Sequence, residues 1–381
     1  MFEPVKEDLL NVTELEVLGK LPDPFLKADG TRVKSPEEWE EQRRALYKTA
    51  VELQYGVQPP APEFLTVEQL TDNQKIHDYR IHTGTYAHPV TMRLQVILPP
   101  DRENVPVIVT GDDCWLYGRN REYLNAALDR GVGWVFFDRA ELAHDIRGEG
   151  RGHGPLYETY PGLSFGAIGA WAWGYSRAVD AIEKIDLPFD LNWIAFTGHS
   201  RGAKTAMLAG ALDRRARIVN PNSTCAGACG CYRIHMKGLY GNEPEKKSET
   251  LADLLRRFDF WMAPELLPYA DREAELPFDE HFLKALVAPR TLYISEAAGD
   301  LWANPVGSYE TTIAAREVFR FLGVEDRVYW SFRPGFHEHR PEDIALLVNV
   351  LLHERDGEAL LPQFFRTPFP KPEPIFDWQA P

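Results

Sequence analysis

The chain is poor in cysteine, and this bears on both disulfides and metal sites. Only four cysteines occur among 381 residues, and three of them lie within residues 225–231. That number is too small for a disulfide scaffold. Structural zinc sites normally combine two separated pairs of ligands, whereas this chain has a single cluster. We therefore predict buried, reduced thiols and no metal site.

Long hydrophobic runs are also absent. No apolar stretch approaches the ~20 residues that are needed to cross a bilayer, so we predict no membrane partner. The first twenty residues, MFEPVKEDLLNVTELEVLGK, lack the basic-then-apolar pattern of a signal peptide. These features predict a cytoplasmic protein, or a secreted one if a leader has been removed.

The chain has no surplus of positive charge. Its formal net charge is −15, whereas binding to nucleic acid needs a basic surface. We therefore predict no nucleic-acid partner. An anionic group on a substrate would need its own local arginine or lysine. The sequence carries no prediction of oligomeric state.

What the chain does contain is an alternation of short buried strands and amphipathic helices. Apolar runs predict core strands at 105–110, 133–137, 193–197, 290–295 and 328–332, and helical patterns between them cover 120–130, 167–184, 201–213 and 308–322. This alternation predicts a mostly parallel sheet with helices on both faces. Strands with a period of two precede it at 76–99. The order is typical of the α/β-hydrolase fold, a three-layer sandwich.

We predict a single α/β-hydrolase domain over residues 1–381. Residues 1–60 are mixed and rich in proline, and we expect them to form an N-terminal extension packed on the core. A helix is predicted there over 36–54, because Ser35 can serve as its N-cap and a proline follows in the first turn. Residues 232–289 lie between two core strands and are expected to be an insertion that forms the cleft rim.

A G-x-S-x-G pattern at residues 198–202 lies between a predicted strand and a predicted helix. The glycines are needed because the chain turns sharply there and larger side chains would collide. Ser200 is then exposed at the tip of the turn, at the positive end of the following helix. That end favours the oxyanion formed during acyl transfer. We predict that Ser200 is a catalytic nucleophile.

A nucleophilic serine needs a base and a carboxylate that orients the base. In this fold they follow in the order serine, acid, histidine. Glu296 and Asp300 follow the fourth predicted core strand, and His337 and His339 follow the fifth. Chain order leaves both Glu296 and Asp300 open as the acid. We predict His337 as the base because it comes directly after a Pro-Gly turn, with His339 as the alternative.

Longer stretches of the chain carry a more specific pattern. They read GAIGAWAWGYSRAVD at 166–180, SRGAK at 200–204, LPFDEH at 276–281, APR at 288–290 and DLWANP at 300–305. Together these stretches resemble segments of carbohydrate esterase family 15, the glucuronoyl esterases. The resemblance implies an α/β-hydrolase fold and a serine esterase that requires no metal or cofactor.

The resemblance also implies roles for individual residues. Ser200 corresponds to the nucleophile, and Arg201 to the residue that stabilises the oxyanion with its side chain as well as its backbone amide. Lys204 is implied to bind sugar hydroxyls and Trp302 to line the sugar site. Arg233 corresponds to a further arginine of the family, and we expect it to bind substrate.

The family's ester bond links the carboxyl group of a 4-O-methyl-glucuronate on xylan to a lignin alcohol. The resemblance therefore implies a small-molecule or oligosaccharide ester as substrate. The reaction would acylate Ser200, release the alcohol, and then hydrolyse the acyl-enzyme with water activated by His337. Two alternatives stay open. One is an acetyl-xylan-type or other sugar deacetylase, and the other is a catalytically silent binding protein with a hydrolase fold.

The chain departs from the family at two positions near the nucleophile. Many members carry the acid as glutamate just after the strand that follows the elbow helix, where this chain has Ser223, which cannot act as a carboxylate. This motivates the catalytically silent alternative. Some bacterial members have the acid in the D-L-W segment instead, which is Asp300 here. The general fold also expects the acid there, so we predict Asp300 as the acid, with Glu296 as the alternative. His199 stands where fungal relatives have a disulfide-bonded cysteine.

Overall fold

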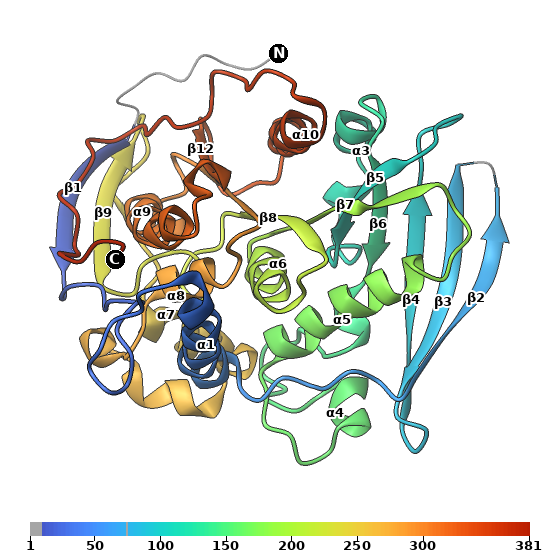
Figure 1. The fold of residues 1–381 in the computed structure, drawn as a ribbon, viewed down its shortest axis with the longest axis horizontal. Coiled ribbons are helices and arrows are strands. Elements are labelled where there is room, and N and C mark those ends of the chain that lie inside the picture. The colour runs from blue at the N-terminus through green and yellow to red at the C-terminus, as the bar shows by residue number, and fades with distance from the viewer. Residues whose placement is uncertain (1–9, 74) are drawn as a thin grey trace.

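One twisted sheet of nine strands forms the centre of the molecule (Figure 1) within the residues that the structure describes, 10–73 and 75–381. The structure is a computed structural model. The strands of this sheet are β2 (Phe64–Asp72), β3 (Ile76–Gly84), β4 (Pro89–Ile97), β5 (Val105–Thr110), β6 (Gly133–Phe137), β7 (Phe189–His199), β8 (Ala216–Asn222), β11 (Thr291–Ala297) and β12 (Val328–Arg333). Their spatial order is β12-β11-β8-β7-β5-β6-β4-β3-β2. The six strands from β12 to β6 pair in parallel, and β4, β3 and β2 add an antiparallel edge.

Helices cover both faces of the sheet (Figure 1). The main helices are α3 (Arg121–Leu128), α5 (Ala167–Ile182), α6 (Arg201–Leu212), α8 (Glu280–Ala285), α9 (Pro305–Phe321) and α10 (Pro341–Asp356), and shorter or peripheral ones are α1 (Pro36–Leu46), α2 (Leu53–Tyr55), α4 (Pro155–Thr159) and α7 (Leu251–Phe258). Successive strand residues face opposite layers. Val107 and Val109 lie in the hydrophobic cluster of α5 and α6, whereas Ile108 lies in that of α3 and α10. The predicted three-layer α/β arrangement is confirmed.

The structure contains the core strands and helices that the apolar runs predicted, with small differences at their ends. The predicted strand at 193–197 is the buried end of the longer β7, whose first residues are half-buried or exposed and carry no apolar run. The helix predicted over 36–54 is α1 followed by a π-helical turn (Tyr47–Glu52) and α2. As expected, the Ser35 side chain caps α1 by accepting from the backbone amide of Glu38.

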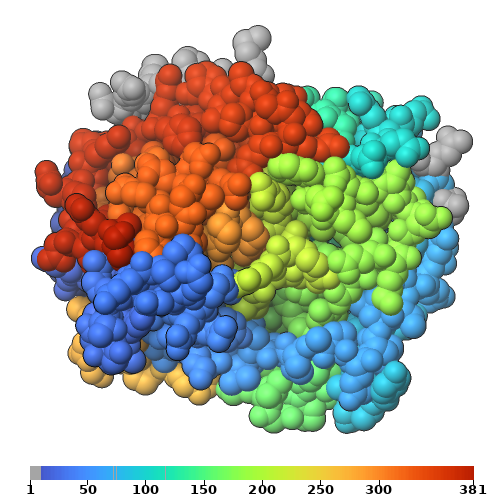
Figure 2. All heavy atoms as spheres, in the orientation of Figure 1, coloured from blue at the N-terminus to red at the C-terminus, as the bar shows by residue number. Residues whose placement is uncertain are grey.

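A second, antiparallel sheet lies beside α9 and joins the two ends of the chain to the 232–289 segment. It consists of β1 (Leu10–Val17), β9 (Ile234–Tyr240) and β10 (Lys246–Lys247). The carboxyl-terminal tail returns to this region, where the Leu21 amide donates to the Ile375 carbonyl at 2.9 Å. Figure 2 shows the blue amino-terminal segment and the red carboxyl-terminal tail side by side on the surface. The predicted domain boundaries stay a prediction, and residues 1–9 of the N-terminal extension lie outside the described residues.

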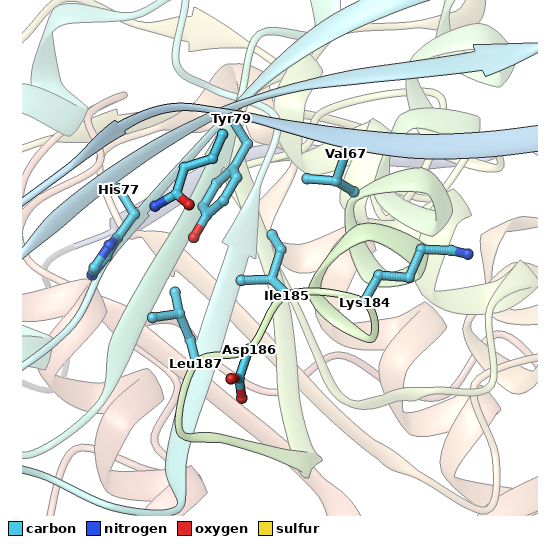
Figure 3. Close-up of a pocket in the computed structure, with 8 residues that line it drawn as sticks. Val67, His77, Tyr79, Lys184, Ile185, Asp186 and Leu187 are labelled. Carbon is cyan, nitrogen blue, oxygen red and sulfur yellow. The ribbon is translucent and has the colours of Figure 1, made fainter.

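No helix in the described part of the chain has both the length and the apolar character that crossing a membrane requires. A surface groove of about 410 Å³ lies between β2, β3 and the turn after α5 (Figure 3). Its walls are Val67, Gln69, His77, Tyr79 and residues 184–187. These residues do not include any of the predicted site residues, so the candidate site lies elsewhere.

Candidate active site

The predicted catalytic residues follow three different strands of the sheet. Ser200 comes directly after β7, Asp300 comes after β11, and His337 comes after β12. Because these strands run in parallel, their carboxyl ends meet at one edge of the sheet, where α/β proteins bind their ligands. The order of the strands therefore collects residues from distant parts of the chain into one site.

The turn that carries Ser200 is strained and tightly packed. Ser200 has φ 57° and ψ −120°, which a non-glycine residue rarely adopts. Its backbone amide donates to the Asn222 carbonyl at 3.0 Å. A Cβ atom at Gly198 would collide with the backbone of Gly202, and one at Gly202 would collide with the Asp112 carboxylate. The two glycines thus allow the sharp turn that leaves Ser200 partly exposed.

Asp300 and His337 form a hydrogen-bonded pair. Nδ1 of His337 lies 2.6 Å from Oδ2 of Asp300. The Asp300 side chain is 3% exposed, whereas that of His337 is 39% exposed. A carboxylate on Nδ1 selects the tautomer whose proton lies on that nitrogen, so Nε2 can act as a base. The structure therefore brings together the two residues that the sequence predicted as acid and base.

The loops that carry this pair are joined through their backbones. The Ala298 amide donates to the Arg333 carbonyl at 2.8 Å, and the Gly299 amide donates to the Gly335 carbonyl at 2.9 Å. The Tyr240 hydroxyl accepts from the Gly335 amide at 2.9 Å. These bonds hold the segment before Asp300 against the segment before His337.

The two alternative residues are buried away from this arrangement. His339 is 6% exposed, and its Nδ1 lies 3.1 Å from the Tyr123 hydroxyl. Burial holds the pKa of His339 well below its usual value. Glu296 is 1% exposed, and its carboxyl oxygens have no hydrogen-bond partner within the described residues. Neither alternative forms the acid–histidine pair.

Glu296 predicts a dependence of stability on pH. Burial raises the pKa of this carboxyl group to about 8. Because the unfolded chain has the lower pKa, the native state binds the extra proton. The stabilisation that this proton provides is complete below the pKa of Glu296 in the unfolded chain and is lost as the pH rises toward 8. The slope approaches about 1.4 kcal/mol per pH unit between these values. Denaturant unfolding at pH 5.5 and 7.5 would measure this. Between these two pH values Glu296→Gln should lose less free energy of unfolding than the parent protein, and equal losses would contradict the assignment.

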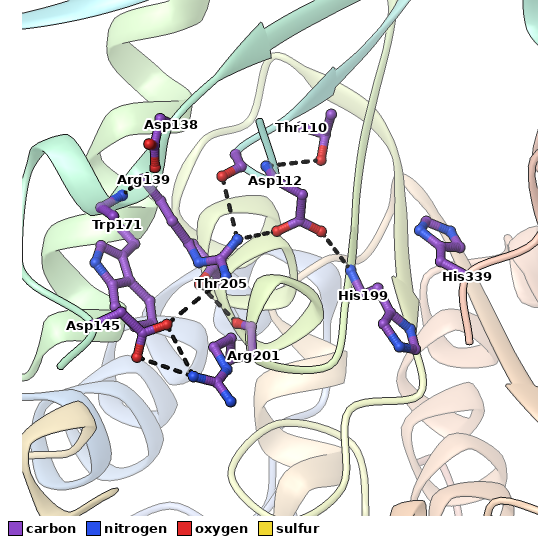
Figure 4. Close-up of polar contacts among 12 residues, drawn as sticks. Thr110, Asp112, Asp138, Arg139, Asp145, Trp171, His199, Arg201, Thr205 and His339 are labelled. Carbon is purple, nitrogen blue, oxygen red and sulfur yellow. Dashed lines mark hydrogen bonds and ion pairs between the residues drawn. The ribbon is translucent and has the colours of Figure 1, made fainter. Parts of the chain in front are cut away.

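Arg201 follows Ser200 and is held between a carboxylate and aromatic rings. Its Nη1 donates to the Asp145 carboxylate at 3.1 Å (Figure 4). The guanidinium carbon lies 4.6 Å from the ring centre of Trp261, 5.1 Å from that of Phe258 and 5.7 Å from that of Trp115. The Arg201 side chain is 25% exposed. A planar cation is thus fixed beside Ser200, and part of its surface remains open to a ligand.

A buried ion pair supports the same turn from behind. The Asp112 carboxylate accepts from the His199 amide at 2.8 Å and from the Arg139 guanidinium (Figure 4). Arg139 and Asp112 are both 1% exposed. Nη2 of Arg139 also lies 3.9 Å from the Asp145 carboxylate. This network links the ends of β5, β6 and β7 to the residue that holds Arg201. Sequence reasoning did not identify Asp145, because its loop shows no periodic pattern.

Lys204 lies one helical turn after Ser200, but its side chain is buried. Its ammonium group donates to the carbonyl oxygens of Thr224 and Ala226 and lies 3.7 Å from the Glu249 carboxylate. Burial raises the pKa of Glu249, and the charge of Lys204 opposes that shift. The Glu249 amide donates to the Trp302 carbonyl at 3.1 Å. The structure therefore places Lys204, Glu249 and Trp302 in one cluster, in which Glu249 was not foreseen.

Arg233 is fully occupied by contacts within the protein. It is 4% exposed, and its guanidinium donates to the Phe278 and Leu276 carbonyls at 2.7 and 2.5 Å. It also lies 3.1 Å from the Asp279 carboxylate. These contacts hold the 274–279 segment, and the role of Arg233 in binding substrate stays a prediction.

The cysteines are unpaired within the structure. Cys225, Cys229 and Cys231 are buried, and Cys114 is exposed. Burial raises the pKa of Cys229 to about 12, so its thiol stays protonated at neutral pH. Among residues 10–73 and 75–381, no group of three or more histidine, cysteine, aspartate or glutamate side chains is arranged to hold a metal ion.

The sheet and the site together define a class of protein. A mostly parallel sheet with a strained serine turn after a central strand and an acid–histidine pair after two later strands is the arrangement of the α/β-hydrolases. The family model described as "Glucuronyl esterase, fungi" matches residues 81–323. The chain belongs to this glucuronyl esterase family, as its sequence motifs predicted.

Individual relatives agree with this assignment. A 4-O-methyl-glucuronoyl methylesterase of Podospora anserina is 29% identical over 320 residues, which cover 83% of this chain and 63% of that protein. The match therefore spans less than two thirds of that relative. A carbohydrate esterase family 15 glucuronoyl esterase from Caldicellulosiruptor kristjansonii has a TM-score of 0.82 and 27% identity, over 96% of this chain and 98% of its own. A Sporotrichum thermophile glucuronoyl esterase in complex with methyl 4-O-methyl-β-D-glucopyranuronate shares the fold, with a TM-score of 0.74 and 22% identity over 94% of this chain and 93% of its own.

Proposed function

We propose that this chain is a serine carboxylic-ester hydrolase that cleaves a carbohydrate ester, with a (4-O-methyl-)glucuronoyl group as the acyl part. The observation that carries the proposal is the 2.6 Å hydrogen bond between His337 and Asp300 at the sheet edge where the strained Ser200 turn lies. An acid, a base and a nucleophile in this order and position are the components of acyl transfer.

Each step of the reaction has a residue to perform it. His337 takes the proton of the Ser200 hydroxyl as the serine oxygen attacks the ester carbonyl. The Arg201 guanidinium and the first amides of α6 stabilise the oxyanion of the tetrahedral intermediate. His337 then protonates the leaving alcohol. In the second half it activates water, which attacks the acyl-enzyme and releases the uronic acid, while Asp300 stabilises the imidazolium in both halves.

The surroundings of Ser200 support a sugar acid as the acyl group. As the family resemblance implies, we propose Lys204 for the sugar hydroxyls and Trp302 for the sugar ring. Glu249 lies 3.7 Å from Lys204 and bonds through its amide to the Trp302 carbonyl, so the three residues belong to one cluster. Phe258 and Trp261 from the 232–289 segment lie against Arg201, which supports the prediction that this segment forms the cleft rim. The matched relative from Podospora anserina is named a 4-O-methyl-glucuronoyl methylesterase.

The oxyanion role of Arg201 makes a kinetic prediction. Arg201→Met should lower kcat by about 10²–10³-fold with little change in KM, because the charge is needed mainly in the transition state. Steady-state kinetics on a glucuronate ester would measure this. Arg256→Met is a matched control, because Arg256 is an exposed arginine on the nearby α7. A variant at position 201 with the parent's kcat would rule out this role.

The proposal is tested by labelling and by a comparison of substrates. A fluorophosphonate probe should modify Ser200, which peptide mass spectrometry would locate. The protein should then hydrolyse benzyl glucuronate and methyl 4-O-methyl-glucuronate faster than it deacetylates a xylo-oligosaccharide. Labelling with only acetate release would reject the uronate substrate in favour of a deacetylase. The absence of labelling would reject the esterase and favour a catalytically silent binding protein.

We propose a cytoplasmic location, with secretion as the alternative. Fractionation of the producing cells, followed by detection of the protein in each fraction, would test it. Recovery from the culture medium would contradict the prediction.

A further inference from the structure

His199 precedes the nucleophile and lies against the catalytic histidine. It is the last residue of β7 and is 4% exposed. The centre of its ring lies 4.5 Å from that of His337, with 44° between the ring planes. This separation is within the range of direct contact between flat rings. His337 itself is substantially exposed, so the buried His199 ring provides a fixed surface on its inner side.

Two hydrogen bonds hold His199 in a single orientation. Its Nδ1 lies 2.7 Å from Oδ1 of Asn222. The Asn222 amide nitrogen donates to the Ser295 hydroxyl at 3.0 Å, which directs Oδ1 toward His199. An amide oxygen only accepts hydrogen bonds, so Nδ1 of His199 carries the proton. The backbone amide of His199 donates to Asp112, so ring and backbone are both fixed.

The surroundings of His199 keep its ring uncharged. The titratable or charged groups around it are His337 and His339 on the loop after β12, Arg333 at the end of β12, Asp300 after β11, Tyr117 in the 116–119 turn and Asp112 after β5. Burial lowers the pKa of His199 to about 3, and the charge of His337 is the second cause of this shift. A neutral ring next to His337 does not compete with it for the catalytic proton.

We propose that His199 is a positioning residue for His337: its ring, fixed by Asn222 and Asp112, supports the catalytic imidazole and shields one side of it from water. The inference rests on the proposed Ser200–His337 chemistry and extends it. Asn222 takes part twice, because its side chain orients His199 and its carbonyl accepts from the Ser200 amide. The nucleophile and the support of its base are therefore fixed by the same residue.

Two variants separate support of His337 from a general role in the turn. His199→Ala removes the ring, and His199→Phe keeps a flat ring without the bond to Asn222. The rate of fluorophosphonate labelling measures the reactivity of Ser200 and His337. No sugar ester is needed, so the result does not depend on the substrate assignment. If the parent protein is not labelled, the proposed function fails. If the parent is labelled and both variants are labelled at the same rate as the parent, only the role of His199 is rejected.

We expect His199→Ala to be labelled about 10–100-fold more slowly, because a catalytic group that is no longer held loses its alignment. The fall of the labelling rate at acid pH (the acid limb) should also move in His199→Ala, because the side of His337 that His199 covers is no longer shielded from water. His199→Phe should stay within about threefold of the parent and keep its acid limb, since the ring support is retained.

Thermal unfolding of both variants shows whether they are folded. If His199→Ala does not fold, His199→Phe still tests the idea, because large loss of labelling in a folded His199→Phe protein would overturn it. Unchanged labelling of folded His199→Ala would also overturn it. An equal loss in both variants, with an unmoved acid limb, would assign His199 to the geometry of the Ser200 turn instead.

Discussion

Replacing Ser200 with alanine should reduce kcat on a glucuronate ester by about 10⁴–10⁶-fold and abolish fluorophosphonate labelling. The reason is that the covalent route is lost, and the remaining arginine and helix amides only stabilise direct attack by water. Substrate binding should be affected little, because the serine hydroxyl is a small part of the contact. Steady-state kinetics and titration of a glucuronate ligand would measure the two effects separately.

Ser223→Ala is the matched control for this variant. Ser223 lies after β8, is fully buried, and its hydroxyl has no hydrogen-bond partner among the described residues. Removing an unpaired buried hydroxyl is close to neutral for stability, and we expect kcat to stay within about twofold. A loss in Ser223→Ala comparable to that in Ser200→Ala would show that the serine after β8, rather than Asp300 alone, supports the chemistry.

Asp300→Asn should lower kcat by about 10⁴-fold. The amide has nearly the shape of the carboxylate, but it can donate to Nδ1 of His337 and so favour the tautomer that has no free base at Nε2. It also cannot stabilise the imidazolium through charge. The loss should be largest near neutral pH, where the parent's His337 works as a base, and a pH–rate profile of kcat would measure it.

The matched control for Asp300→Asn is Glu296→Gln, which changes the carboxyl group at the end of β11 in the same way. Because burial raises the pKa of Glu296 to about 8, the parent carries a neutral side chain there at pH 7, and the amide should preserve activity. If Glu296→Gln were the inactive variant and Asp300→Asn the active one, the acid would have to be reassigned.

Local patterns in the sequence predicted most of the core strands and the turn that carries Ser200, but not β8, whose residues ARIVNPN contain no long apolar run. Buried parallel strands have continuous apolar runs, so β5 and β6 were predicted with their observed ends. In contrast, β1 is mostly exposed and has no such run. It forms because it pairs with β9, more than 200 residues later in the chain. Pairing over such distances leaves no signal in a local window.

The site shows the same division between local and long-range information. The chain order of serine, acid and histidine, together with the resemblance of the D-L-W segment, predicted the Asp300–His337 pair that the structure contains, with Glu296 and His339 as the alternatives. The burial of Lys204 was not predictable, because it depends on carbonyl groups of a turn in which Ser223 and Cys225 both have positive φ. The partner of Arg201 was missed for a similar reason, since Asp145 lies 56 residues earlier.

The ion pair between Arg201 and Asp145 has a consequence for turnover. Hydrolysis of a uronate ester creates a new anion next to Arg201, and an unpaired guanidinium would attract that product strongly. Asp145 already balances the arginine at 3.1 Å, and the net charge of −15 repels anions from the whole surface. In the proposed reaction, the arginine would therefore stabilise a brief oxyanion without retaining the finished carboxylate, and the cleft would be free for the next ester.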